Sequence, residues 1–419
     1  MVCSPERTSL VFAALENDPT ARSEGLLGGG APSPSAAPFG VYLHVPFCAH
    51  ICPYCDFNTY AGQSHLIPRY VDALQRDIMR QGQNVDGREA ATIFFGGGTP
   101  SLLPASDVAR LVDACRASFN VVADAEITLE ANPNGVDEAY FDALLDAGIN
   151  RLSIGAQTLH HRGLRALGRL HEANDTARAV IAARSAGFTN ISLDLIFGWP
   201  GQTLADWETD LTAVLRGHLG GTAPDHLSLY NLIVEPGTPL HDAVSRGILS
   251  VPDDDAGADL YETAISHLAA AGYTHYEVAN WARDSSHVSR HNLVYWRNGE
   301  YVGVGAGAHG HLSSHRTMNH LLPTTYCQAI EGGENPVSNS EDIPPTTAMA
   351  ETMMLGLRLL EEGISAGAFD RRHGHTLDEV YGPTIDQLVA QDLMIRSGDR
   401  LRLTPRGLML ANDVCARFV

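Results

Sequence analysis

Hydrophobic residues along this chain alternate between two spacings. Short apolar runs such as 41–45 are typical of β-strands, whereas the next amphipathic stretch, 70–79, has apolar residues three and four positions apart, as in an α-helix. The same order of strand and helix recurs until about residue 271. The predicted strands are 41–45, 92–95, 126–129, 151–154, 191–196 and 226–230, and the predicted helices are 70–79, 107–119, 138–147, 173–186, 204–215 and 256–271.

Strand and helix units in series favour parallel strands joined by right-handed crossovers. An open doubly wound sheet and a complete or partial (β/α) barrel both fit this periodicity. Unusual polar residues decide between them, because a barrel gathers chemistry from the ends of many strands, whereas a doubly wound sheet concentrates it at one switch point. Here such residues belong to five successive strands, so we predict an α/β fold with a partial, TIM-like (β/α)6 barrel. They are the cysteines at 48–55, the glycines at 96–98, Glu130 with Asn132, Gln157 and Asp194.

Composition divides the chain into four parts. Residues 28–38 are rich in Gly, Pro, Ser and Ala, which cannot bury enough apolar surface to offset the entropy of ordering. The C-terminal part has three helical stretches, then two short strands at 393–396 and 401–403 and a last helix, as in winged-helix-like domains. We predict a flexible tail at 1–38, the barrel at 39–275, a His- and aromatic-rich appendage at 276–340 and the winged-helix-like domain at 341–419. The three helical stretches are 348–360, 376–381 and 384–391.

Charge excludes several classes of function. The 419 residues include 28 basic and 49 acidic ones, a formal net charge of −21, which argues against a nucleic-acid partner. All 28 basic residues are Arg. Without Lys there is no Schiff-base lysine, no pyridoxal-phosphate lysine and no Walker-type phosphate lysine.

The seven cysteines are odd in number and dispersed, which indicates a reducing, cytoplasmic location rather than a secreted disulfide framework. The longest apolar stretch near the N-terminus, 10–15, is far shorter than the roughly 20 residues that cross a bilayer. We therefore expect no export signal and no membrane span.

Three of the cysteines, Cys48, Cys52 and Cys55, form a C-x3-C-x2-C run directly after the first predicted strand. Soft thiolate ligands select zinc or an iron–sulfur cluster. A structural zinc site closes with four protein ligands and would need His44 or His50 as the fourth. A cluster held by three thiolates instead leaves one iron open to an outside ligand, and we favour this interpretation.

This loop, the preceding Tyr42 and the later Gly-Gly-Gly-Thr-Pro run at 96–100 resemble the radical S-adenosylmethionine superfamily, and within it the HemN/HemW branch. The resemblance covers residues 40–419 and implies a 4Fe-4S cluster whose open iron takes the amino and carboxylate groups of S-adenosylmethionine. One electron then cleaves the sulfonium to methionine and a 5′-deoxyadenosyl radical. The residues expected to contact S-adenosylmethionine are Tyr42, Tyr54, Gly97, Gly98, Thr99, Glu130, Gln157, Arg169 and Asp194.

Each of these residues also has an ordinary structural explanation. The glycines suit a tight turn, Glu130 a helix cap and Arg169 a solvated surface charge. Their joint position at successive strand ends favours the functional one.

Two sequence features distinguish the dehydrogenases of this branch from its heme chaperones. Its dehydrogenases carry a fourth Cys two residues after the third, where this chain has Phe57. The run His291, Asn292, Leu293, Val294, Tyr295, Trp296 matches the H-N-x-x-Y-W motif of the heme-chaperone (HemW) group, in which a His nitrogen can bind iron and the aromatic rings can cover a porphyrin. The same run also suits a core segment with a hydrogen-bonded His, and His309 and His311 are further candidate ligands among 19 His.

The resemblance therefore predicts a heme chaperone that carries a 4Fe-4S cluster and S-adenosylmethionine and passes heme to acceptor hemoproteins, membrane-associated ones included. A homodimer is compatible with this prediction. The alternative is an enzyme that oxidatively decarboxylates the propionates of coproporphyrinogen III. With no Lys in the chain, any propionate held by charge must meet Arg or His.

Overall fold

A computed structural model describes residues 37–85, 87–217 and 219–419. The predicted tail at 1–38 lies outside these ranges except for its last two residues. Every structural statement below concerns the described residues.

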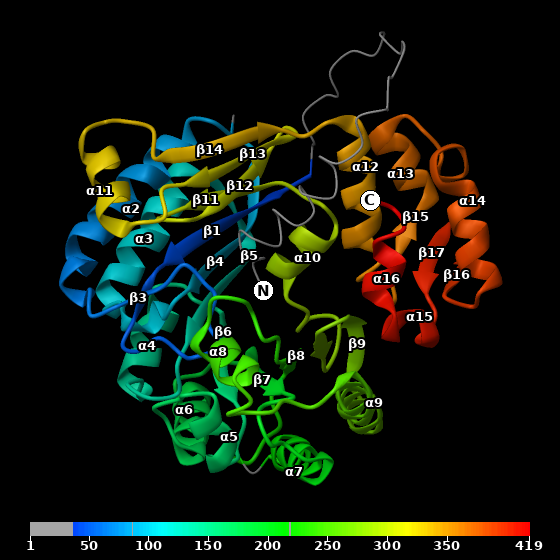
Figure 1. Cartoon of the computed structure of the whole chain (residues 1–419). Coiled ribbons are helices and arrows are strands. Elements are labelled where there is room, and N and C mark those ends of the chain that lie inside the picture. The colour runs from blue at the N-terminus through cyan, green and yellow to red at the C-terminus, as the bar shows by residue number, and fades with distance from the viewer. Residues whose placement is uncertain (1–36, 86, 218) are drawn as a thin grey trace.

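The centre of the molecule is one 12-stranded mixed sheet with the order β14-β13-β12-β11-β1-β4-β5-β6-β7-β8-β10-β9 (Figure 1). Its six middle strands run parallel and are the six predicted from the sequence, which confirms the α/β fold. The sheet curves but has two edges, so the barrel is partial. The six strands are β1 (Phe39–Val45), β4 (Glu89–Gly97), β5 (Asn120–Ala131), β6 (Arg151–Gln157), β7 (Ile191–Phe197) and β8 (His226–Asn231).

Helices cover the outer face of this sheet because every second strand residue is apolar and points outward. On β5, Ile127 and Leu129 belong to the main hydrophobic core, and the alternate residues Glu126, Thr128 and Glu130 face inward. The helices of this half are α2 (Ile67–Gly82), α3 (Ala105–Ser118), α4 (Glu138–Asp146), α5 (His161–Ala166), α6 (Ala173–Ser185), α7 (Leu204–Leu215), α8 (Pro239–Ser245) and α9 (Asp254–Ala270), with 3-10 turns at Ser64–Leu66 and Pro100–Leu102.

The inner face is polar, unlike the packed interior of a complete barrel, where branched apolar residues dominate. Strand registers place small or polar side chains next to one another on this face. An interior built this way has room and hydrogen-bonding groups for a polar ligand. Its members are Tyr42, His44, Thr92, Glu126, Thr128, Glu130, Arg151, Ser153, Ser192, Asp194, His226 and Ser228.

The segment predicted as an appendage extends the sheet at both edges. β11 (Tyr301–Val304) pairs parallel to β1, and antiparallel β12, β13 and β14 follow it. At the other edge, β10 and β9 pair antiparallel to β8 and to each other. Helices α10 and α11 lie between these strands in the sequence. The bounds are β9 (Thr274–Glu277), β10 (Asn280–Ala282), α10 (Arg290–Trp296), β12 (His309–Leu312), β13 (His315–Asn319), α11 (Pro323–Glu331) and β14 (Val337–Asp342).

The C-terminal part has its own small core and a three-stranded sheet (Figure 1, orange to red). The two stretches predicted separately at 376–381 and 384–391 are one helix, α14. Pro383 lies inside it, and the burial of Ile385 and Leu388 holds its second half against the core. Helix α13 was not predicted. The elements are α12 (Pro345–Gly356), β15 (Ile364–Ser365), α13 (Ala366–His373), α14 (Leu377–Ala390), β16 (Met394–Ser397), β17 (Arg400–Leu403), α15 (Pro405–Met409) and α16 (Ala411–Cys415).

Candidate functional site

The three cysteines lie on a loop at the C-terminal end of β1. Strand β2 (Phe47–Cys48) pairs with β3 (Tyr60–Ala61) and closes this loop at its base. All three thiols are unpaired and half-buried. Burial raises the pKa of the Cys48 thiol and raises that of Cys55 to about 11. The Cys48 and Cys55 thiols are therefore protonated without a metal, and metal binding would release their protons.

Side chains from other strand ends contact these sulfurs. The Thr99 hydroxyl donates to Cys48 Sγ at 3.5 Å, and Arg169 Nη1 donates to Cys52 Sγ at 3.5 Å. A Cβ on Gly98 would stand 3.0 Å from Cys48 Sγ, so only glycine allows this approach. Arg169 is thus directed at the cysteine loop and is not a solvated surface charge.

The backbone amides of the glycine loop are already used. Gly98 N donates to Val45 O at 2.8 Å, Thr99 N to Phe47 O at 2.9 Å and Gly97 N to Glu130 Oε2 at 3.2 Å. A ligand at this loop would therefore meet the carbonyl oxygens and the Thr99 hydroxyl rather than amide donors. Such acceptors suit an ammonium group.

Two carboxylates face the interior beside this loop. Burial, followed by the nearby charge of Asp194, raises the pKa of Glu130 to about 7. Burial also raises the pKa of Asp194, which accepts hydrogen bonds from Ser153 Oγ at 3.0 Å and Ser192 Oγ at 3.3 Å. Bringing a cation between them would favour their ionised forms.

Gln157 and Arg169 complete the site from β6 and the segment after α5. Gln157 has a φ of +64°, a strained conformation for a residue with a side chain, and such strain is common at ligand sites. Arg169 Nη2 donates to Asn132 Oδ1 and to Gly155 O at 3.3 Å. Asn132, which also donates to Thr99 Oγ1 at 3.2 Å, was noted in the sequence but not predicted as a ligand.

The two predicted tyrosines differ in setting. Tyr54 lies within the cysteine loop, and its ring packs against a small apolar cluster that includes Trp199. Burial raises the pKa of Tyr54, and the charge of Arg169 partly offsets this effect. The hydroxyl of Tyr42 is bonded to His44 Nδ1 at 2.9 Å, and its ring stacks on Phe94. Tyr42 thus lies on the inner face of β1, two residues before His44.

The zinc alternative lacks its fourth ligand. Both ring nitrogens of His44 are occupied, Nδ1 by Tyr42 and Nε2 by Asn58 O at 2.9 Å, and His50 is exposed. Over residues 37–85, 87–217 and 219–419, no group of three or more His, Cys, Asp or Glu side chains is arranged to hold a single metal ion.

The predicted heme motif forms the buried helix α10. His291 is 1% exposed, with Nδ1 bonded to Thr92 Oγ1 at 2.7 Å and Nε2 to the Tyr295 hydroxyl at 2.8 Å. Trp296 is covered by the Arg358 guanidinium, 4.3 Å from its ring centre. The backbone amide of Asn292 donates to the Oγ of Ser289, the N-cap of this helix, at 3.4 Å. In this conformation the motif is a hydrogen-bonded part of the core.

The two other candidate histidines lie on β12. His311 is 7% exposed and bonds through Nδ1 to Gly299 O at 3.2 Å, whereas His309 is half-buried.

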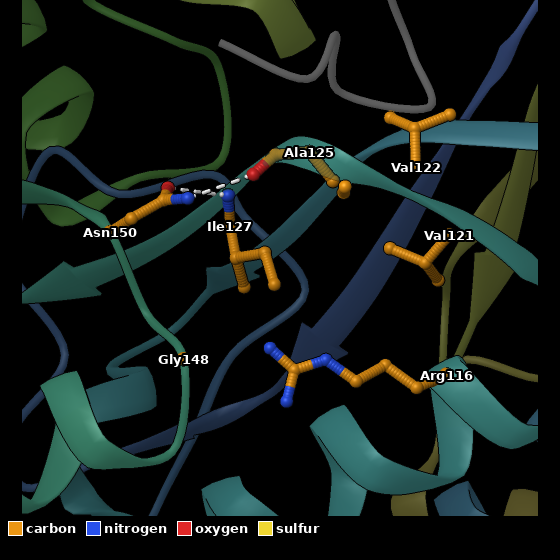
Figure 2. Close-up of a pocket in the computed structure, with 8 residues that line it drawn as sticks. Arg116, Val121, Val122, Ala125, Ile127, Gly148 and Asn150 are labelled. Carbon is orange, nitrogen blue, oxygen red and sulfur yellow. Dashed lines mark hydrogen bonds between the residues drawn. The ribbon is translucent and has the colours of Figure 1, made fainter.

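A separate pocket lies at the opposite end of β5 from Glu130 (Figure 2). Arg116, Val121, Gly148 and Asn150 are among its lining residues, and none of the predicted site residues lines it.

Comparisons with known proteins agree with this fold. The model of the Radical SAM superfamily matches residues 42–214, and the model of the HemN C-terminal domain matches residues 343–410. The HemN coproporphyrinogen III oxidase of Escherichia coli, a radical SAM enzyme, has the same fold, with a TM-score of 0.77, 23% identity and coverage of 91% of this chain and 90% of that one. The class of protein defined by fold and site is therefore radical SAM.

Sequence relatives identify the family within this class. The heme chaperone HemW of Bacillus subtilis (strain 168) is 36% identical over 379 residues, which cover 90% of this chain and 98% of the relative. The heme chaperone HemW of Mycobacterium tuberculosis (strain CDC 1551 / Oshkosh) is 39% identical over 394 residues, 93% of this chain and 96% of the relative. The chain belongs to the HemW family. Among its described helices, none has the length and apolarity needed to cross a membrane.

Proposed function

We propose that this protein is a heme chaperone that binds heme and transfers it to acceptor hemoproteins, and that it carries a 4Fe-4S cluster and S-adenosylmethionine. The observation that carries the proposal is the set of three half-buried thiols at the mouth of a polar, open barrel, two of which accept hydrogen bonds from Thr99 and Arg169. The near full-length similarity to HemW chaperones supports the heme part.

The donor set fits the cluster. Cys48, Cys52 and Cys55 would hold three irons, and Arg169 and Thr99 would donate to the thiolate sulfurs, which stabilises their negative charge. When bound, the cluster supplies one open iron and one electron for cleaving the sulfonium of S-adenosylmethionine.

The cosubstrate contacts follow from the chemistry of each group. Carbonyl oxygens at Gly97 and Gly98 and the hydroxyl of Thr99 suit the ammonium of the methionine end, while the carboxylates of Glu130 and Asp194 suit the ribose hydroxyls and the sulfonium charge. Gln157 and Arg169 would close the site from β6, and Tyr42 and Tyr54 would line it. The protein's unpaired thiols suit the reducing cytosol.

Phe57 favours the chaperone over the alternative, a coproporphyrinogen III dehydrogenase. It is exposed and occupies the place of the fourth Cys of the dehydrogenase branch. The proposed partners are acceptor hemoproteins, membrane-associated ones included. The proposal is also compatible with a homodimer.

One anaerobic experiment tests both parts. The full chain is reconstituted with iron and sulfide, and hemin binding is followed by the Soret band. Coproporphyrinogen III, S-adenosylmethionine and a reductant are then added to a separate sample. We expect the first sample to bind hemin and the second to form no protoporphyrinogen IX. Formation of that product, or no hemin binding at all, would overturn the chaperone proposal.

The cluster has its own test. A variant with Cys48, Cys52 and Cys55 all replaced by Ala should retain neither iron nor sulfide.

A further inference from the structure

A His nitrogen is a common axial ligand of heme iron, and the structure ranks the candidate histidines differently from the sequence. A ligand nitrogen must have a free lone pair directed at the metal. Both ring nitrogens of His291 are taken, by Thr92 and by Tyr295, across the inner face of the sheet. Using His291 would cost the hydrogen bond of the nitrogen that binds iron, and turning the ring toward a ligand would disturb its stacking on Phe94, whose ring centre lies 4.9 Å away.

His309 has no such commitments. It is the first residue of β12, half-buried, and its ring makes no hydrogen bond to any described residue. Burial lowers the pKa of this ring, so it is neutral at physiological pH, the form that binds iron.

The surroundings of His309 suit a flat ligand. Residues two apart on a strand share a face, so His309 and His311 lie on one side of β12. The ring of Tyr301 lies 6.1 Å from that of His311 and 4.8 Å from that of Tyr295, so aromatic rings continue from this face to α10. Opposite His309, β13 places half-buried Met318 at the paired position. Aromatic and thioether groups are the apolar partners that a porphyrin face prefers.

This face also adjoins the cysteine loop. Asn58, three residues after Cys55, donates through Nδ2 to Ala306 O at 3.1 Å and to Leu321 O at 3.0 Å. Gly307 has a φ of +74°, and a Cβ there would come within 2.4 Å of Asn58 Nδ2. The turn that leads into His309 is thus packed directly on the end of the cysteine loop.

We propose that His309, rather than His291, supplies the axial nitrogen to the heme iron, on the face of β12 that adjoins the cysteine loop. The inference rests on the proposed heme-binding function. It assigns to α10 a structural role in supporting this face through Tyr295 and leaves the iron to His309.

The test uses the full chain and two probes, hemin and metal-free protoporphyrin IX. His309→Ala should weaken hemin binding about tenfold or more and shift its Soret band, because an axial bond is lost. Binding of metal-free protoporphyrin IX should be unchanged, since it offers no iron. Added imidazole should restore the Soret band of the variant, which a general loss of structure would not allow. The matched control is His315→Ala, because His315 lies on the neighbouring strand β13 with a side chain that is 44% exposed.

The outcomes separate this inference from the function on which it rests. The assignment of His309 would be overturned if the Soret band of His309→Ala were identical to that of wild type. It would also be overturned if only His291→Ala lost hemin binding and imidazole restored it there. Either result would leave the chaperone proposal intact. Failure of the unaltered protein to bind hemin would overturn the chaperone proposal itself.

Discussion

Burial keeps the ring of His291 neutral in the folded protein by lowering its pKa to about 3. In the unfolded chain a histidine titrates near 6.5, so between these values the unfolded state binds a proton that the folded state does not. The contribution of His291 to stability is therefore complete above about pH 6.5 and is lost as the pH falls toward 3, by about 1.4 kcal/mol per unit.

Replacing this residue should remove that dependence. We expect His291→Ala to be destabilised by about 2 kcal/mol or more at pH 7.5, because two hydrogen bonds and a stacked ring are lost. Between pH 7.5 and 5.0 its free energy of unfolding should fall by about 2 kcal/mol less than that of wild type. Urea titrations at the two pH values measure this. An equal change in the free energy of unfolding between the two pH values in variant and wild type would show that the ring is not neutral in the folded state. His50→Ala, at an exposed position, is the control.

At the scale of the element, α10 is fixed by a single carboxylate. Ser289 caps the helix, and Glu126 from β5 accepts from the amides of Arg290 at 2.9 Å and His291 at 3.0 Å. A carboxylate at a helix N-terminus forms charge-assisted bonds with amides that have no partner within the helix. Glu126 is 5% exposed, so water cannot replace it.

Neutralising this carboxylate should loosen α10. We expect Glu126→Gln to lower the free energy of unfolding by about 1–3 kcal/mol and to speed amide hydrogen exchange in 290–296. Glu138→Gln removes an exposed carboxylate from the first turn of α4 and should cost a few tenths of a kcal/mol, about the value of a surface dipole contact. Equal effects of the two substitutions would contradict the role given to Glu126.

At the scale of the whole molecule, α10 lies between the barrel and the C-terminal part (Figure 1). Arg358 covers the Trp296 ring and approaches fully buried Glu277 at 3.6 Å. Backbone bonds accompany this contact, from Val278 N to Arg358 O and from Leu360 N to Tyr276 O. One arginine thus joins helix α10, the sheet edge and the C-terminal part.

Removing that arginine should weaken the whole assembly. Arg358→Ala leaves Glu277 buried without its cation, so we expect a loss of about 3–5 kcal/mol in the free energy of unfolding. Tryptophan emission should shift to longer wavelength as Trp296 becomes hydrated. Arg371→Ala, at an exposed position of α13, is the control. A loss below about 1 kcal/mol would mean that the contact acts as a surface ion pair.

The sequence by itself determined the local features of this protein. Alternating apolar residues fixed the six parallel strands, since each strand buries every second side chain under a helix, and the cysteine and glycine runs indicated the chemistry at the first two strand ends. Only the tertiary structure decided which side chains meet. Arg169 reaches Cys52 across 117 residues, and His291 reaches Thr92 across 199. The order and curvature of the sheet set such pairs, so the histidine of a motif that suggested an iron ligand is hydrogen-bonded within the core.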